Sequence, residues 1–310
     1  MYAQLLVDQP FVTRCIAQRL GKCLGISERQ CSPPTDNQVL RKAYQLNRQP
    51  NRAEVTKLAE NIGWTSYNVY KWFRQARNCT KPSKLIRFGE SFWRLSYHFT
   101  SLAFGIVIFY QESLLNISRC FNGSQSDSHS TAIVAYWSTQ LGYCTSAVLL
   151  QLISAIRKDT TFAHATFFCH LATTTLLAIS YVTKMLKIGT VVMLVHDICD
   201  MLVEVAYLLD YITYSGLSQA MFIVFAITFF VTRLLIYPFW ILRSVLFVLP
   251  ESVTPSPALN LTLVLLVVIQ MVHVYRFQHI AVMAGRSLKG RTAKQITELS
   301  SDSDSAKKNE

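Results

Sequence analysis

The sequence is poor in charge, and it lacks the cysteine patterns and the leader that mark zinc-binding or secreted proteins. Charged residues make up 15% of its 310 residues, whereas 51% are hydrophobic, which lies outside the profile of soluble globular proteins. The eight cysteines form no C-x-x-C pair, so they are expected to be mostly free, without a zinc framework or a disulfide scaffold. No uninterrupted apolar run follows Met1, which argues against an ordinary signal peptide. Several membrane spans best explain this composition.

Six apolar segments dominate the chain. They cover residues 91–111, 132–152, 162–182, 188–209, 220–242 and 258–281. At a rise of about 1.5 Å per residue, each reaches about 30 Å, the thickness of a hydrocarbon core. We therefore predict an all-α, polytopic membrane bundle of about six spans. The predicted division is an amphipathic N-terminal segment (1–31), a cytosolic helical module (32–83), a transmembrane domain (84–285) and a cytosolic acidic-serine tail (286–310).

The formal net charge of +12 also fits a membrane protein, because basic residues mark cytosolic loops and contact anionic lipid. The basic stretch before the first segment, Arg157 and Lys158 after the second, and the basic residues after the last all fall on one side. We assign that side, and the C-terminus, to the cytosol. Asn116 and Asn122 begin Asn-x-Ser sequons between the first two segments, so they are expected to face a lumen where glycosylation occurs.

The fourth segment carries polar side chains that are costly in hydrocarbon. His196, Asp200 and Glu204 recur every four residues, and Asp197 lies three residues before Asp200, so all four share one stripe of a helix. An Asp at the centre of a membrane helix costs about 2.5–3.5 kcal/mol on insertion scales. The stripe, together with His170 of the third segment, therefore indicates a cavity with a function.

These motifs resemble the signature of the ceramide synthases, a family among the TLC-domain membrane proteins. The matching positions are His170, Thr173, Ser180, Gly189, Thr190, His196, Asp197, Asp200 and Glu204. The fifth segment is similar to a second stretch of the family, from residue 227 to residue 242, which includes Arg233 and Pro238. Pro238 is expected to kink this helix, and Arg233 to need an acidic partner or an aqueous cavity. The chain departs from the family pattern at Cys169, Lys184, Lys187 and Tyr207.

The resemblance implies an enzyme of the endoplasmic-reticulum membrane that N-acylates a sphingoid base with fatty acyl-CoA. This reaction needs a proton acceptor and donors for an oxyanion. We expect His170 to be the base, and Asp200 or Asp197 to orient it and balance charge. His196 would transfer a proton or contact substrate. The expected substrate contacts are Thr173, Ser180, Glu204, Arg157, Lys158 and Arg233. No metal and no cofactor are implied, because acyl-CoA is the substrate, and the expected partners are membrane lipid and other ceramide synthases in oligomers.

Cys169 stands in place of the first of two adjacent His in the family motif, and its role is open. In a two-step route its thiolate would accept the acyl group first. Neighbours on a helix point about 100° apart, so His170 is poorly placed to activate it. Cys169 can equally be a small buried residue without a role. The substitution also allows a catalytically impaired relative that binds substrate and regulates active ceramide synthases in hetero-oligomers.

Two other interpretations of the polar stripe remain open. The seven His of the chain are scattered, which argues against the clustered histidines of a di-iron site, but a single metal held by His170, His196 and Asp200 is conceivable. The stripe can also be a polar seam that only joins helices. If the third and fourth segments are antiparallel neighbours, His170 and Asp200 should lie at the same depth, which favours a shared catalytic site.

The module before the membrane domain ends in the sequence YNVYKWFRQARN, residues 67–78, which resembles a homeodomain recognition helix. Gln75 stands where that helix has the Asn that reads adenine, and Ala76 replaces an Arg. Both changes argue against DNA reading, so a membrane-tethered DNA-binding protein is kept only as an alternative. Trp72 and Phe73 are expected to hold a small helical core, with a basic face towards lipid headgroups or CoA phosphates.

Both ends of the chain carry a further pattern. Val12, Ile16, Leu20 and Leu24 recur every four residues, as in a helix that lies on a membrane surface, although a short packing helix or a loosely ordered leader fits as well. Near the C-terminus, Ser301 lies in an acidic serine run that resembles phosphorylated tails of the family.

Overall fold

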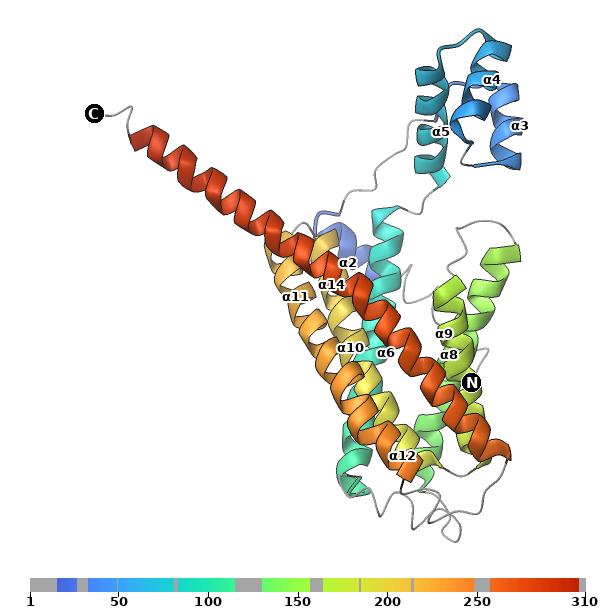
Figure 1. Ribbon diagram of the computed structural model, residues 1–310, viewed down its shortest axis with the longest axis vertical. Coiled ribbons are helices and arrows are strands. Elements are labelled where there is room, and N and C mark those ends of the chain that lie inside the picture. Colours follow the sequence, from blue (N-terminus) through green and yellow to red (C-terminus); the bar gives the residue numbers. More distant parts are fainter. Residues whose placement is uncertain are drawn as a thin grey trace.

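The computed structural model describes the backbone of residues 16–26, 33–48, 50–80, 83–114, 130–156, 164–183, 185–212, 215–247 and 257–306. Within these ranges it does not describe the side chains of residues 80, 154–156, 164–166, 169, 215, 258–259 and 286–306. Every regular element in the described part of the chain is a helix, which confirms the all-α prediction. Figure 1 shows a bundle of long helices and a smaller helical unit.

Three short helices form the smaller unit. They are α3 (Gln38–Leu46), α4 (Arg52–Ile62) and α5 (Ser66–Thr80). The helix ends are specified locally: the Asn37 side chain accepts hydrogen bonds from two backbone N–H groups of α3, and Asn51 and Glu54 form a capping box on α4. Gly63 ends α4 with a φ of 66°, a left-handed conformation that glycine adopts without steric cost.

Trp72 and Phe73 lie in the core of this three-helix unit, as predicted. Trp72 Nε1 also donates a hydrogen bond to Thr35 O at 2.7 Å, which fixes the segment that precedes α3. In Figure 1 the unit stands beyond one end of the bundle. Its homeobox likeness and its predicted boundaries stay predictions.

The bundle contains the apolar helices. Its elements are α2 (Gln18–Cys23), α6 (Lys84–Gln111), α8 (Thr131–Ile156), α9 (His164–Val182), α10 (Leu186–Tyr211), α11 (Ser215–Phe229), η2 (Phe230–Leu242), α12 (Arg243–Phe247) and α14 (Pro257–Ala306). Each of the six predicted apolar segments coincides with one helix or, for the fifth, with α11 and η2. By length and composition, two stretches of the described chain qualify as candidate membrane spans, Gly216–Phe247 and Asn260–Gly285. The count of six spans stays a prediction.

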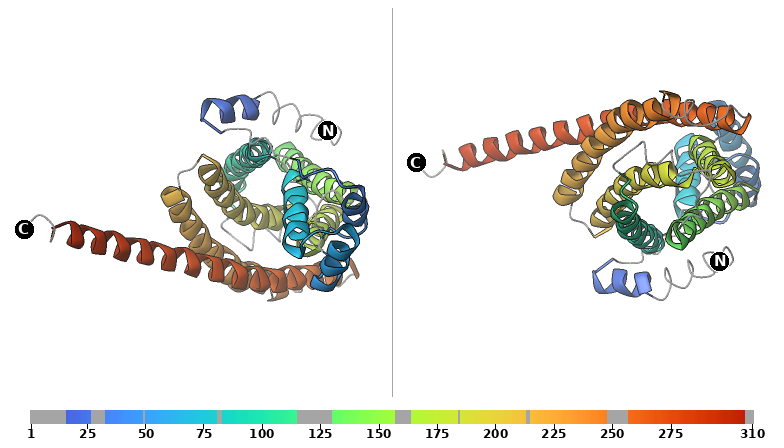
Figure 2. Two further views of the ribbon diagram at one scale, coloured as in Figure 1. Left: turned by 90° about the horizontal axis from the view of Figure 1, so that it is seen from above. Right: turned by 90° about the horizontal axis from the view of Figure 1, so that it is seen from below.

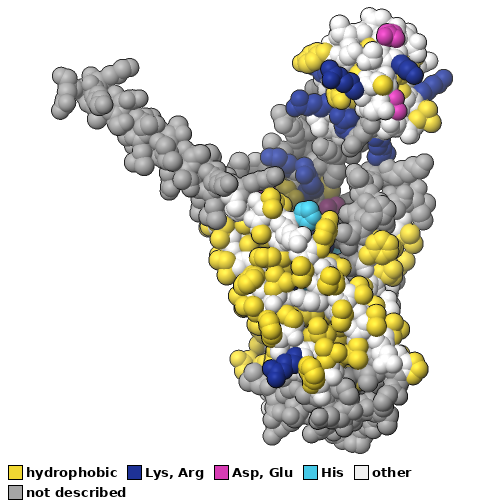
Figure 3. Space-filling model, in the orientation of Figure 1, with side chains coloured by type: hydrophobic (Ala, Val, Ile, Leu, Met, Phe, Trp, Pro, Cys, Tyr) yellow, Lys and Arg dark blue, Asp and Glu magenta, His cyan; other side chains and the backbone are white. Residues whose placement is uncertain are grey.

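Helix α10 is central to the bundle. It packs against α6 and α11, whereas α9 packs against α8 and α14, and α14 also contacts η2 and α11. Figure 2, viewed along the bundle axis, shows α11 and α14 along one outer side of the other helices. In Figure 3 the bundle presents a largely hydrophobic face, and most of the Lys and Arg side chains on that face gather at the end near the three-helix unit. A lipid-facing bundle with a basic cytosolic end has this distribution.

Short helix α2 lies against α6, and its apolar stripe points outward. Ile16, Leu20 and Leu24 are 50%, 40% and 44% exposed. On the opposite face, Gly21 is buried where a larger side chain would overlap α6. Surface binding to a membrane stays a prediction, and Val12 lies outside the described residues.

Element η2 is π-helical and contains Pro238. The N–H of Arg243 at its end donates to Pro238 O, five residues earlier. Proline lacks the N–H that an α-helix would require, and the wider π-helical turn is one known way to accommodate such an interruption. The helix continues directly into α12.

Helix α14 does not end with the predicted span at residue 281. Its backbone continues as a helix to Ala306 and forms the long projection in Figure 1. The predicted tail is therefore helical over most of its length, because no proline interrupts this stretch. The side chain of Ser301 lies outside the described part.

Three of the described cysteines are outside any disulfide. Cys144 and Cys199 are buried, and Cys23 is exposed. Cys79, at the end of α5, differs because it is disulfide-bonded.

Gly189 and Trp137 explain a close approach between α8 and α10. The Trp137 ring lies where a Cβ atom of residue 189 would be. From this position Trp137 Nε1 donates to Leu186 O at 3.0 Å and to Thr190 Oγ1 at 3.2 Å. Gly189 and Thr190 of the sequence motif thus act together, since one makes room for the indole and the other accepts its hydrogen bond.

We predict that Gly189→Ala destabilises the bundle, because the added methyl group overlaps the Trp137 ring. Overpacking of this kind costs about 1–3 kcal/mol. The thermal unfolding temperature of the purified protein in detergent should fall accordingly. Gly216→Ala is the matched control, since open space surrounds its missing Cβ; an equal loss in both variants would contradict the prediction.

Candidate functional site

The polar stripe of α10 divides between two sides of the helix. Asp197 and Glu204 contact α6, whereas His196 and Asp200 lie near η2 and α14. The predicted cluster is therefore two separate polar groups joined by one helix.

The Asp197 carboxylate lies at the centre of a buried network between α6, α8 and α10. Asp197 is 2% exposed, and its Oδ1 lies 3.0 Å from His98 Nδ1. Its Oδ2 accepts hydrogen bonds from Ser101 Oγ at 2.6 Å and Gln140 Nε2 at 2.9 Å, with Tyr136 OH at 3.4 Å. A carboxylate only accepts, so His98 donates through Nδ1. The predicted orienting role of Asp197 is thus directed at His98 rather than at His170.

The partners of Asp197 could not be identified from the sequence. His98 lies 99 residues from Asp197, and Gln140 lies 57 residues from it. The sequence did offer one indication, because His98 and Gln140 are polar residues inside predicted apolar segments. Gln140 is 1% exposed and its Oε1 also accepts from Tyr97 OH at 2.7 Å, so every polar atom of its amide has a partner.

Glu204 forms a salt bridge with Arg94 of α6. Arg94 Nε lies 2.6 Å from Glu204 Oε1 and Nη2 lies 3.2 Å from Oε2, a bidentate pair that fixes both side chains. Arg94 Nη2 also donates to Ser91 Oγ at 3.0 Å. The substrate contact predicted for Glu204 would have to be made together with Arg94.

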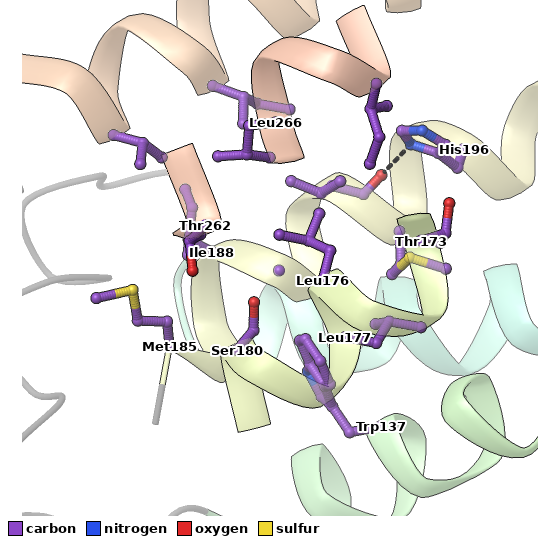
Figure 4. Close-up of a pocket in the computed structure, with 16 residues that line it drawn as sticks. Trp137, Thr173, Leu176, Leu177, Ser180, Met185, Ile188, His196, Thr262 and Leu266 are labelled. Carbon is purple, nitrogen blue, oxygen red and sulfur yellow. Dashed lines mark hydrogen bonds between the residues drawn. The ribbon is translucent and has the colours of Figure 1, made fainter. Parts of the chain in front are cut away.

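His196 has a defined hydrogen-bonding state. Its Nδ1 lies 2.7 Å from Val192 O, the bond drawn in Figure 4. A carbonyl oxygen only accepts, so Nδ1 carries the proton and, in the neutral ring, Nε2 keeps its lone pair. Ring centroids of His273 and Tyr237 lie 5.2 Å and 6.0 Å from that of His196. Nε2 is therefore the atom of His196 that can accept a proton.

Arg233 is buried at 4% exposure and contacts both sides of the His196 turn. Its Nη2 donates to His196 O at 3.2 Å and lies 3.5 Å from Asp200 Oδ1. Its Nη1 lies 3.0 Å from His273 Nε2. Asp200 is thus the acidic partner expected for Arg233, whereas His273 of α14 was not identified from the sequence.

His170 lies partly buried on α9 and interacts electrostatically with Asp200, Arg276 and His98. That His170 and Asp200 lie at the same depth stays a prediction. The Asp200 side chain is 44% exposed, so the site is open at this point. Among the described residues, no group of three or more His, Cys, Asp or Glu is arranged to hold a metal ion.

An apolar pocket begins at His196 and Thr173. It lies between residues of α8, α9, α10, η2, α12 and α14, and its cavity volume is about 40 Å³. Figure 4 shows His196 and Thr173 near one end and Met185, Ser180 and Thr262 near the other. Between them the lining is mainly aliphatic. Its members are Leu176, Leu177, Ile188, Val192, Met193, Ile241, Val245, Leu266 and Ile269.

Several predicted site residues lie outside the described part of the structure. They are the side chain of Cys169, residues Arg157 and Lys158, the sequon residues Asn116 and Asn122, and the side chain of Ser301. Their roles stay predictions.

Comparison with known proteins identifies the family. Residues 87–282 match the model of the TLC-domain family. The chain is 31% identical to human ceramide synthase 5 over 284 residues, which cover 91% of this chain and 72% of that relative. The chain belongs to the ceramide synthase group of the TLC-domain family. The resemblance seen in the sequence motifs is thereby confirmed.

Other ceramide synthases give the same result. The chain is 28% identical to human ceramide synthase 3 over 300 residues, covering 96% of this chain and 76% of the relative. It is 30% identical to mouse ceramide synthase 4 over 266 residues, covering 85% and 67%. The matches extend over most of the chain, so the family assignment does not rest on the α10 motif alone.

We predict that Gln140→Leu destabilises the fold, because it leaves polar atoms of Asp197 and Tyr97 with fewer partners. Each buried group left unpaired costs about 1–3 kcal/mol. Thermal unfolding in detergent measures the loss. Ser138→Ala on the same helix is the control, since Ser138 Oγ donates only to Val134 O of its own helix at 2.8 Å. Equal stability of the two variants would show that the network contributes nothing.

Proposed function

We propose that this chain transfers a fatty acyl group from acyl-CoA to the amine of a sphingoid base, forming a ceramide. The observation that carries the proposal is the mainly aliphatic pocket that His196 and Thr173 line together. Its aliphatic walls suit an acyl chain, whereas the polar groups at its end suit acyl transfer. The relatives named as ceramide synthases support this choice of substrates.

Acyl-CoA would enter from the end where His170 and Asp200 lie. The open position of Asp200 supports this route. The charged CoA moiety would stay near Arg157 and Lys158, because guanidinium and ammonium groups bind phosphates. The acyl chain would then run past Thr173 and on to Ser180, both of which line the pocket.

The proposed reaction begins when the sphingoid ammonium gives a proton to a base. The neutral amine attacks the thioester carbonyl carbon and the C–N bond forms. The nitrogen then loses a second proton as the C–S bond breaks. CoA leaves as a thiolate and takes up one of the two protons, and the other is released to water. We propose His170 as the base, oriented by Asp200, and His196 as the residue that relays the proton through Nε2. A route through an acylated Cys169 would need a partner from another helix to form its thiolate.

We place the protein in the endoplasmic-reticulum membrane with six spans and a cytosolic C-terminus. The gathering of basic side chains at one end of the bundle supports the cytosolic assignment of that end. In this orientation Asn116 and Asn122 are lumenal and open to glycosylation, and Ser301 is open to cytosolic kinases. Association with other ceramide synthases is part of the proposal.

We predict that His170→Ala and His196→Ala each lower ceramide formation by about 10²–10⁴-fold, the usual contribution of a positioned acid or base. The measurement uses microsomes from cells without their own ceramide synthases, with labelled sphinganine and a panel of acyl-CoAs. His279→Ala is the control, because His279 is exposed on α14. An unchanged rate in His170→Ala would rule out its role as the base.

The same assay tests the function itself. Product above background with the unaltered chain supports the proposal and shows that Cys169 is compatible with catalysis. Inserted, folded protein that binds acyl-CoA without making product would indicate a regulatory relative instead. Cys169→His would then be the next variant to assay.

We predict that Val245→Phe shifts the preference towards shorter acyl-CoAs, because Val245 lines the pocket about two helical turns beyond Tyr237, whose ring centroid lies 6.0 Å from that of His196. Each methylene excluded from the pocket forgoes about 0.8 kcal/mol of burial, so long chains should lose rate while short chains keep it. Leu246→Phe is the control, because Leu246 is the next residue in the chain and its side chain is exposed. A uniform loss for all chain lengths would argue against a pocket that selects by length.

A further inference from the structure

His98 of α6 forms a fixed pair with Asp197 of α10. Its Nδ1 lies 3.0 Å from Asp197 Oδ1, and the other carboxylate oxygen accepts hydrogen bonds from Ser101 and Gln140 at 2.6 Å and 2.9 Å. The carboxylate is thereby held through both of its oxygens. Because Nδ1 donates to it, the neutral His98 ring keeps its lone pair on Nε2. His98 therefore offers one defined proton acceptor, on the side of the ring away from Asp197.

Neighbouring aromatic rings hold the orientation of this imidazole. Ring centroids of Tyr97 and Tyr143 lie 5.3 Å and 5.5 Å from that of His98, in edge-on arrangements. The two tyrosine rings stack on each other with a centroid distance of 3.8 Å. Tyr97 OH donates to Gln140 Oε1 at 2.7 Å, which joins this stack to the network around Asp197. A ring fixed in this way needs little rearrangement before it accepts a proton.

The acceptor atom of His98 is accessible. Three buried side-chain polar atoms in the described part of the chain have no hydrogen-bond partner, and they belong to Arg233, Gln270 and His273. His98 Nε2 is not one of them, although the His98 ring forms its hydrogen bond with the described residues through Nδ1. Nε2 therefore borders open space. A buried histidine that only joined helices would be expected to have both ring nitrogens paired.

Asp200 connects His98 to the proposed reacting groups. At about 100° per residue, Asp200 lies about 60° from Asp197 around α10 and about 40° from His196, so it stands between the two polar sides of the helix. It interacts electrostatically with His98 and with His170, and these two His also interact with each other. The Asp200 side chain is 44% exposed. Helices α6, α9 and α10 thus bring two His and an accessible carboxylate together.

The proposed reaction removes two protons from the sphingoid nitrogen. The first leaves the ammonium group before the attack, and His170 is the proposed base for it. The second leaves as the C–S bond breaks, because the amide nitrogen of the product carries one hydrogen fewer than the attacking amine. A base that still holds the first proton cannot accept the second. The reaction therefore needs a second acceptor near His170.

We propose that His98 is the second catalytic base of the acyl transfer and accepts this proton through Nε2. As the C–S bond breaks, the C=O bond re-forms, and the N–H electron pair stays on nitrogen while its proton moves to His98. The thiolate of CoA takes up the proton held by His170. Asp197 is the positioning residue and stabilises the His98 imidazolium, which then releases its proton to water on the open side near Asp200. This inference rests on the proposed function.

The test is His98→Asn, whose side-chain amide reaches the position of Nδ1. This variant can still donate to Asp197, but it has no basic nitrogen in place of Nε2. We expect kcat for ceramide formation to fall by about 10²–10⁴-fold, the usual contribution of a positioned base, with little change in KM for palmitoyl-CoA. Ser96→Ala is the control on the same helix, because Ser96 Oγ donates to Phe92 O of α6 itself at 2.9 Å. It should keep the kcat of the unaltered chain.

A kcat of His98→Asn close to that of Ser96→Ala would overturn the inference, because the bond to Asp197 would then be all that His98 contributes. Membrane insertion and thermal unfolding are measured for every variant. If His98→Asn does not fold, His98→Ala is assayed with added imidazole and methylated imidazoles. A proton acceptor is expected to give rates that rise with the basicity of the additive, whereas no rescue, or rescue that is independent of basicity, would reject this role. Absence of ceramide from the unaltered chain would instead reject the proposed function.

Discussion

A polar group between apolar helices must find its partner within the protein, because hydrocarbon offers none. In this chain α10 meets that constraint with different helices at different levels. Asp197 is paired through α6 and α8, Glu204 through α6, and Asp200 through η2. These bonds fix α10 in depth and rotation against its neighbours. The helix that carries the site therefore also determines where the surrounding helices lie.

The two sides of α10 therefore have different polar partners. The side facing α6 and α8 contains the fully paired network around Asp197, which gives the bundle a single arrangement. The side facing η2 and α14 has a partly exposed acid, Asp200, and two buried donors, Arg233 Nε and His273 Nδ1, without a hydrogen-bond partner among the described residues. The two sides thus differ in how completely their polar atoms are paired.

Periodicity and composition were enough to predict the helices and the importance of α10. Hydrophobic runs gave the six apolar segments, and the spacing of His196, Asp197, Asp200 and Glu204 gave the stripe. The division of the stripe could not be predicted, since it depends on the rotation of α10 against helices far away in sequence. His98 and His273 were missed for the same reason, because a lone polar residue in an apolar run does not reveal its partner. Gly189 was recognised as part of a motif, but only packing against Trp137 explains it.

In the proposed function, acyl-chain length and acyl transfer depend on different parts of one pocket. His196 of α10 and Thr173 of α9 line it near the polar groups, whereas Val245 belongs to α12, a helix of only five residues. In that proposal, a substitution in this short helix would alter which acyl chains fit without moving the reacting groups, because those groups lie on the longer helices. The composition of the lipid product would then depend on a few residues far from the bond that forms.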